Sequence, residues 1–376
     1  MRRFAKGRFA LAHPLFDFSV RGTENGGLPI WRGSSQLGRE VLELEMTSQA
    51  AISTETGTKR EDRIRAAFYR GDALTVDNPA YVHALRGLAD ELLRQDTLLG
   101  DATVDALGIG DRKCAVEIRA KDAGVAAGVS EAQWLYDRAG LVTSRGVNDG
   151  DPIAAGNVLL RVEGDAKILL SLERLVVNLM QRMSGIATVT RKLVEAISRQ
   201  SPNAHVVATR KTPWGVLDKR AVHVGGGGTH RLSLGDAILI KTNHLLLAAS
   251  GSTTRMEDAI RRAWANRKAA AFFEVEVTST EEALLAARAL HDLQASDSSC
   301  PCVLMLDNFS PAQAAAVAAL RERDLHDAVL FEASGNVAEA SLAAYAAAGV
   351  DVISIGALTH SARALDLSAK LIPGPR

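Results

Sequence analysis

The second half of this 376-residue chain repeats one pattern, a short apolar segment followed by an alanine-rich amphipathic segment. The apolar segments have the length of buried strands, and the segments that follow them have helical spacing. Alternating strands and helices favour a parallel sheet. Because no dinucleotide-binding glycine pattern is present, six such units in order favour a barrel or partial barrel over a doubly wound sheet. The predicted strands are 205–209, 237–241, 271–277, 303–307, 329–333 and 352–356, and the predicted helices are 255–268, 279–294, 310–322 and 336–348.

The region before this repeat reads as a separate α+β module. Apolar residues at helical spacing predict a helix over 81–94, and alternation predicts a strand over 113–120. Further elements are expected at 123–129, 131–139 and 158–162. A long helical stretch over 168–199 follows, and Ser184-Gly185 is expected to break it into two pieces. Residues 1–75 keep no apolar period and read as a weakly ordered extension, with short helices near 37–46 and 61–69.

Composition excludes several classes of partner. The chain has 44 basic and 44 acidic residues, so it lacks the basic field that nucleic acids and anionic membranes attract. No apolar run approaches the roughly 20 residues of a membrane span. The odd number of cysteines, three, suits reduced thiols in a cytoplasmic protein. The basic, acid-free first sixteen residues leave an organellar presequence as the alternative to a cytoplasmic location.

Charged side chains stand where the predicted strands end. Cations follow two of these strands and a four-glycine run, as Arg210-Lys211, His230-Arg231 and Lys241. Two other strands carry acids, Glu274 with Glu276 and Asp307. Strand ends are where barrels place their working residues. Cations gathered in a neutral chain and facing carboxylates predict a phosphorylated substrate handled with a divalent metal.

An ordered series of motifs resembles the quinolinate phosphoribosyltransferase family, the type II phosphoribosyltransferases. The similarity runs from about residue 76 to the end, and its beginning is carried by Asn78–Tyr81 and Gly100–Thr103. Each motif is modest alone, whereas their order is specific. The remaining motifs are Glu173-Arg174, Gln181–Thr188, Thr209–Pro213, Gly225–Arg231, Leu239–His244, Glu274–Val277, Met305–Phe309, Glu332–Gly335 and Ile355–Ser361.

This resemblance implies an α/β fold, an incomplete TIM-like α/β barrel preceded by an α+β open-sandwich domain. The sandwich would span 76–176 and be joined by a C-terminal helix over 361–376, and the barrel would span 177–360. The family makes nicotinate mononucleotide from quinolinate and phosphoribosyl diphosphate with Mg²⁺, releasing carbon dioxide and diphosphate.

The resemblance also implies a quinolinate pocket. Arg210, His230 and Arg231 would hold the two carboxylates, and Thr209 would line the same pocket. Arg174 would reach it from a neighbouring subunit, because the family shares active sites between the subunits of a homodimer or a larger assembly. An arginine fork suits a planar dicarboxylate because it binds two oxygens at once.

On the phosphoribosyl side, Lys211 and Lys241 would hold diphosphate oxygens. Glu276 and Asp307 would bind the ribose hydroxyls and Mg²⁺, partly through water or substrate. Breaking the bond between ribose and diphosphate builds positive charge on the sugar and negative charge on the leaving group, and these residue types stabilise both. No protein nucleophile is needed. The 5′-phosphate would lie against Ser334, Gly335 and Gly356.

Some residues depart from the family pattern, and other interpretations stay open. Trp214 is unexpected, and Thr242 and Asn336 replace the family's usual aspartate and glycine, which bears on strict quinolinate preference. A paralogue acting on another acid, such as those associated with molybdenum uptake, is one alternative. A phosphometabolite-binding protein without catalysis is another, against which Glu276, Asp307, Lys211 and Lys241 argue. Separately, Glu276 and Asp307 could be structural ion-pair members.

Overall fold

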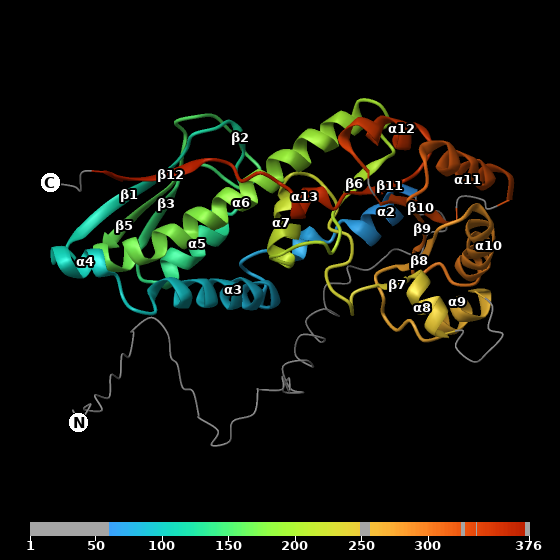
Figure 1. Ribbon diagram of the computed structural model, residues 1–376, viewed down its shortest axis with the longest axis horizontal. Helices are drawn as coiled ribbons and strands as arrows, with labels where there is room; N and C mark the ends of the chain where they lie inside the picture. The colour runs from blue at the N-terminus through green and yellow to red at the C-terminus, as the bar shows by residue number, and fades with distance from the viewer. Residues whose placement is uncertain (1–59, 249–255, 325–327, 336, 373–376) are drawn as a thin grey trace, which may run out of the picture. The chain divides into compact units, whose positions relative to one another are not determined.

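The computed structural model describes residues 60–248, 256–324, 328–335 and 337–372, which lie within one unit of the chain, Glu55–Arg376 (Figure 1). The short helix predicted near 37–46 lies outside the described residues. No helix in the described ranges combines the length and the apolar character that a membrane crossing requires.

Six parallel strands form one sheet in the order β6-β11-β10-β9-β8-β7. In the described part of the chain this order has two ends, so the strands do not close into a complete ring, although Val207 of β6 also bridges Gly228. Each predicted strand overlaps an observed one, and the predicted α/β class is confirmed. The bounds are β6 His205–Val207, β7 Ile238–Ile240, β8 Phe273–Val277, β9 Cys302–Asp307, β10 Leu330–Ser334 and β11 Val352–Ser354.

Helices follow the strands of this sheet, because the strands are largely buried on both faces and need cover on both. The fourth predicted helix, over 336–348, forms only a 3₁₀ turn at Glu339–Ser341 and the short helix α12. The others correspond to α9, α10 and α11. The bounds are α7 Val216–Val224, α8 Thr242–Ala248, α9 Met256–Ala265, α10 Thr280–Ser296, α11 Pro311–Asp324, α12 Leu342–Ala347 and α13 Ala357–His360.

The helix α2, Arg60–Phe68, confirms the short helix predicted near 61–69, whereas its packing in the core corrects the prediction that this part of 1–75 is a weakly ordered extension. Its buried face contributes Ile64, Ala67 and Phe68 to a core cluster with the first residues of several strands. The polar residues that dominate its sequence lie on the other face of the helix. The hydrophobic periodicity of the segment is therefore too weak to predict that one face is buried. The partners in the cluster are Val207, Ala237, Phe272, Val303, Leu330 and Val352.

A second, antiparallel sheet has the order β12-β1-β5-β3, and the helices α5 and α6 lie along one of its faces (Figure 1). The predicted strand over 113–120 is observed with those bounds. The elements of this part are α3 Pro79–Thr97, α4 Ala102–Leu107, β1 Lys113–Ala120, β2 Gly124–Val125, α5 Val129–Arg138, β3 Val142–Arg145, β4 Pro152–Ile153, β5 Val158–Asp165 and α6 Ala166–Ser198.

The predicted C-terminal helix over 361–376 is wrong. Residues Leu367–Ile372 form the strand β12, which pairs antiparallel with β1 from Ala115↔Ile372 to Ala120↔Leu367. The free edge of β1 supplies backbone hydrogen-bond partners that local helix propensity does not anticipate. The C-terminal segment therefore completes the antiparallel sheet as a strand.

The predicted break at Ser184-Gly185 is also wrong, because α6 runs unbroken from Ala166 to Ser198. A Cβ atom at Gly185 would lie 2.1 Å from the carbonyl oxygen of Arg363, so glycine permits a close approach here. Ser184 Oγ accepts a hydrogen bond from the backbone of Ala127 (3.0 Å). Both residues serve packing, and the helix spans the predicted domain boundary at 176/177.

Candidate active site

The register of the parallel sheet brings four predicted site residues to one edge. Ile240 lies level with Val275, so Lys241 reaches the level of Glu276, and Asp307 lies level with Ser334. The Lys241 ammonium group forms an ion pair with the Glu276 carboxylate. Burial and the Glu276 charge raise the pKa of Asp307, while Lys241, Asn308 and Lys211 oppose the rise. Lys211, Lys241, Glu276 and Asp307 therefore form one electrostatic group, here called the strand-end group.

The strand-end group offers oxygen ligands for a divalent cation. Asp307 and Glu276 stand on adjacent strands, and the Glu276 charge raises the pKa of Asp307. A cation between the two carboxylates would relieve this repulsion. Carboxylate oxygens are the ligands that Mg²⁺ prefers. These two residues fit the predicted metal, and Asp307 Oδ2 accepts one hydrogen bond, from Asn308 Nδ2 (2.9 Å).

The turns beside this group require glycine. Gly335 has φ +85°, and a Cβ atom there would lie 2.3 Å from Asn308 Oδ1. The backbone N–H of Asn308 donates a hydrogen bond to the Ser334 carbonyl oxygen (2.9 Å), which connects the ends of β9 and β10. At Gly356 a Cβ atom would lie 3.2 Å from Lys211 Cδ, so this glycine adjoins the lysine side chain. Residue Asn336 lies outside the described residues.

Arg210 and Arg231 form a cationic cluster beside the strand-end group. Arg231 is buried, and its pKa is lowered by burial and by the charge of Arg210. Thr209 Oγ1 accepts a hydrogen bond from the Lys211 amide (3.0 Å), so its hydroxyl shapes the segment that carries both Arg210 and Lys211. The structure thus brings Arg210 and Arg231 together, as predicted for an anion site.

A third cation, Lys219 on α7, was not identified from the sequence. It is 1% exposed, and its Nζ donates to the Thr229 carbonyl oxygen (2.5 Å). Burial lowers its pKa to about 7, with Arg210 and Arg231 adding to the effect and Asp236 opposing it. The sequence did contain an indication of this burial. Lys219 precedes the apolar residue Val222 by three positions, so the two side chains lie on the same face of the helix.

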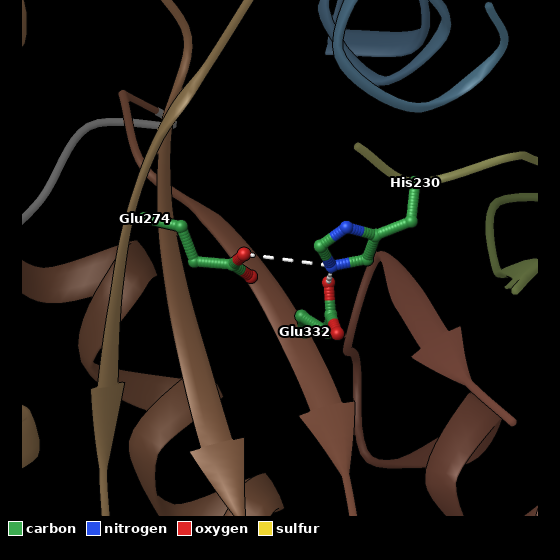
Figure 2. Close-up of side chains that lie close together, drawn as sticks. All are labelled: His230, Glu274 and Glu332. Atoms are coloured by element: carbon green, nitrogen blue, oxygen red, sulfur yellow. Dashed lines mark ion pairs between the residues drawn. The ribbon is translucent and has the colours of Figure 1, made fainter. Parts of the chain in front are cut away.

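The side chain of His230 lies between those of Glu274 on β8 and Glu332 on β10 (Figure 2). Its Nδ1 accepts a hydrogen bond from the Arg231 amide (2.7 Å), and its Nε2 lies 3.2 Å from Glu332 Oε2 and 3.4 Å from Glu274 Oε2. Because Nδ1 accepts, the ring proton is on Nε2. Nδ1 therefore faces the Arg231 backbone and Nε2 faces the two carboxylates, and the contact of His230 with quinolinate stays a prediction.

The pKa values of the two glutamates are shifted in opposite directions. Burial and Glu332 raise the pKa of Glu274 well above its usual range. Burial also opposes ionisation of Glu332, but His230 holds the pKa of Glu332 below its usual value. The ligand atoms of the three side chains lie within 4.8 Å of one another, which is a spacing found at metal centres. The contacts of Nε2 with the two carboxylates account for this spacing without a metal ion.

Arg174 is the one predicted residue that the structure keeps apart from the others. Its side chain on α6 is 63% exposed and lies 3.9 Å from Glu173. No interaction with another predicted site residue is present among the described residues. His244, in contrast, adjoins the site, because its Nδ1 accepts from the Lys241 amide (2.9 Å).

Comparison with known proteins gives consistent matches. The family models "Quinolinate phosphoribosyl transferase, N-terminal domain" and "C-terminal domain" match residues 101–184 and 186–370. The chain is 40% identical to the "Probable nicotinate-nucleotide pyrophosphorylase [carboxylating]" of Archaeoglobus fulgidus over 71% of its own length and 98% of the relative.

The "Nicotinate-nucleotide pyrophosphorylase [carboxylating]" of Mycobacterium leprae is also 40% identical, over 67% of this chain and 84% of the relative. Among solved structures, the nicotinate-nucleotide pyrophosphorylase of Francisella tularensis matches with a TM-score of 0.64 and 29% identity, covering 77% of this chain and 96% of that one. The chain therefore belongs to the quinolinate phosphoribosyl transferase family.

Proposed function

We propose that the protein transfers the phosphoribosyl group of phosphoribosyl diphosphate to the ring nitrogen of quinolinate. The bond from ribose C1 to the diphosphate oxygen breaks, and a bond from C1 to the ring nitrogen forms. The carboxylate next to that nitrogen then leaves as carbon dioxide, and a proton takes its place on the ring. The products are nicotinate mononucleotide, diphosphate and carbon dioxide, which makes the protein a nicotinate-nucleotide diphosphorylase (carboxylating).

One observation carries this proposal: a cluster of three cations stands beside a group of two lysines and two carboxylates. The cluster consists of Arg210, which is exposed, and of Arg231 and Lys219, which are buried, and the charges of the two arginines act on Lys219. A ligand with two carboxylates would relieve their mutual repulsion, whereas a monoacid would compensate less of it. The cluster therefore favours a dicarboxylate over nicotinate.

In this mechanism the residues bind and orient rather than form covalent bonds. Lys211 and Lys241 would hold the diphosphate oxygens and stabilise the charge that develops as this group leaves. Lys241 is paired with Glu276 in the structure, so diphosphate would take over this ammonium group and release Glu276 for the ribose hydroxyls. Glu276 and Asp307 would hold Mg²⁺, which when bound supplies positive charge to the diphosphate.

Arg174 supports the proposal of an active site shared within a homodimer. It is exposed on α6, away from the strand-end group of its own chain. An arginine supplied by the partner subunit would add a further guanidinium to the pocket and close it over quinolinate. This assembly is the proposal most directly open to a mixing experiment, described in the Discussion.

The activity is tested by incubating the protein with phosphoribosyl diphosphate, Mg²⁺ and quinolinate labelled in the carboxylate next to the ring nitrogen. Labelled carbon dioxide and nicotinate mononucleotide are expected, with no nucleotide formed from nicotinate. Arg210→Ala should abolish the release. Arg261→Ala is the matched control, because Arg261 forms an exposed pair with Asp292 (3.3 Å) on the helical surface. Nucleotide formation without label release would reject the carboxylating activity.

A further inference from the structure

A buried ion pair connects α6 with the segment that carries Arg210 and Lys211. Arg182 of α6 donates to both carboxylate oxygens of Asp218, from Nε and from Nη2, each at 2.7 Å. The Asp218 side chain is fully buried, and that of Arg182 is 22% exposed. Two parallel hydrogen bonds fix the relative orientation of both groups. The long helix therefore holds the first turn of α7 in a defined place.

Asp218 also accepts hydrogen bonds from the loop between β6 and α7. Its Oδ2 accepts hydrogen bonds from the Thr212 hydroxyl and from the Trp214 amide (3.3 Å). Thr212 directly follows Lys211 in the chain. A buried carboxylate with several donors is a rigid anchor, because each donor loses its partner if the carboxylate moves.

Trp214, which the family resemblance does not anticipate, has a place in this arrangement. The guanidinium carbon of Arg182 lies 5.1 Å from the centre of the Trp214 ring. A guanidinium over an indole face is a favourable cation–π geometry. The ring thus covers the outer side of the ion pair and limits its access to water, which strengthens the pair's electrostatic attraction.

Lys211 is also held from its other side. Arg182 Nη2 donates to the Thr359 carbonyl oxygen (2.9 Å), and the Thr359 hydroxyl donates to the Lys211 carbonyl oxygen (2.9 Å). Thr359 is buried in α13, one turn after Gly356, which itself adjoins the Lys211 side chain. Arg182 therefore reaches Lys211 by two routes, one through Asp218 and Thr212 and one through Thr359.

We propose that Arg182 and Asp218 are positioning residues that set where the Lys211 ammonium group and the Arg210 guanidinium meet the two substrates. In the proposed function neither residue has a contact with substrate. The inference rests on the proposed function, because the diphosphate and dicarboxylate roles of Lys211 and Arg210 come from it. Trp214 is the part of this arrangement that the family resemblance does not anticipate.

The test compares Arg182→Lys with wild type. Lysine keeps the charge but cannot bind both carboxylate oxygens in one plane, nor stack as a planar group on Trp214. Displacement of reacting groups by about 1 Å can cost about 100-fold in rate, so kcat/KM for both substrates should fall by about that factor. The thermal midpoint of Arg182→Lys should stay close to that of wild type. Arg191→Lys is the matched control, because Arg191 also lies on α6 and donates to Gly225 O (3.1 Å), away from Lys211.

A second measurement separates positioning from general destabilisation. Added guanidinium ion should restore at least tenfold of the activity lost in Arg182→Ala, since it can refill the site between Asp218 and Trp214. It should restore nothing in Lys211→Ala. If Arg182→Lys does not fold, Trp214→Leu keeps the ion pair and should lower kcat/KM several-fold, with no change in secondary structure.

The inference would be overturned if Arg182→Lys folds and keeps full activity. It would also be overturned if Trp214→Leu folds and keeps full activity while guanidinium does not rescue Arg182→Ala. Absence of turnover in wild type would instead reject the proposed function. The two failures are therefore distinguishable.

Discussion

Replacing Glu131 by glutamine tests the electrostatics of the antiparallel part of the molecule. Glu131 lies in the first turn of α5 and is fully buried. It accepts a hydrogen bond from the Tyr81 hydroxyl (2.7 Å) and lies 3.8 Å from Arg220 Nε. Burial, with a contribution from Asp149, raises its pKa from 4.5 to about 7, against the opposing effects of Tyr81 and Arg220.

The direction of the pH effect follows from this rise. The folded chain binds the Glu131 proton more tightly than the unfolded chain does, so the contribution to stability is complete below about pH 4.5 and is lost as the pH rises to about 7. At about 1.4 kcal/mol for each tenfold change in proton affinity, the loss is about 3 kcal/mol. Glutamine cannot ionise and keeps an oxygen for Tyr81, so Glu131→Gln should remove this loss.

The assay is urea unfolding of wild type and Glu131→Gln from pH 4.5 to 8, at one protein concentration because assembly would otherwise contribute. The variant should gain about 3 kcal/mol relative to wild type across this range, since the other titrating groups are common to both proteins. Two parallel pH profiles would refute the assignment of a proton to buried Glu131.

The remaining predictions concern the barrel and its site. Phe68→Ala should lower the free energy of unfolding, measured with urea, by about 3–5 kcal/mol, because it leaves a cavity in the core cluster that α2 forms with the strands. A truncated protein that begins at residue 60 should keep the fold, whereas one that begins at residue 70 should not. Burial lowers the pKa of Lys219 to about 7, so a dicarboxylate should drive proton uptake when it binds at pH 8; calorimetry in buffers of different ionisation enthalpy should detect this uptake in wild type and not in Lys219→Met. Mixing inactive Arg174→Ala with inactive Lys241→Ala should restore part of the activity, and no recovery after verified subunit exchange would argue against shared sites.

The sequence predicted the parallel sheet well because its signal is local. Strands buried on both faces are short apolar runs, as in Cys302–Asp307, and such runs are visible without a partner. The side chains at the ends of these strands were predicted to converge for the same reason. Parallel strands present their ends at one edge of the sheet, so Lys241, Glu276 and Asp307 had to lie close together.

The prediction failed where the deciding contact lies far along the chain. Leu367–Ile372 has helix-forming residues, and only the free edge of β1 makes it a strand. The helix at Arg60–Phe68 was predicted, but its burial was not, because its three apolar side chains become part of a core only through contact with the strands of the parallel sheet. The Gly185 position was interpreted as a break because the backbone of Arg363, which it accommodates, is 178 residues away.

The sequence by itself determined the family, the chemical character of the site and the edge of the sheet that carries it, because these depend on residue type, order and strand period. The tertiary structure decided the surroundings of each charge. His230 faces the Arg231 amide and the carboxylates of Glu274 and Glu332, whereas Lys219 is buried beside Arg210 and Arg231. The physical reason is that hydrogen-bond partners and burial are properties of neighbours in space, and these fix a side chain's tautomer, charge and reach.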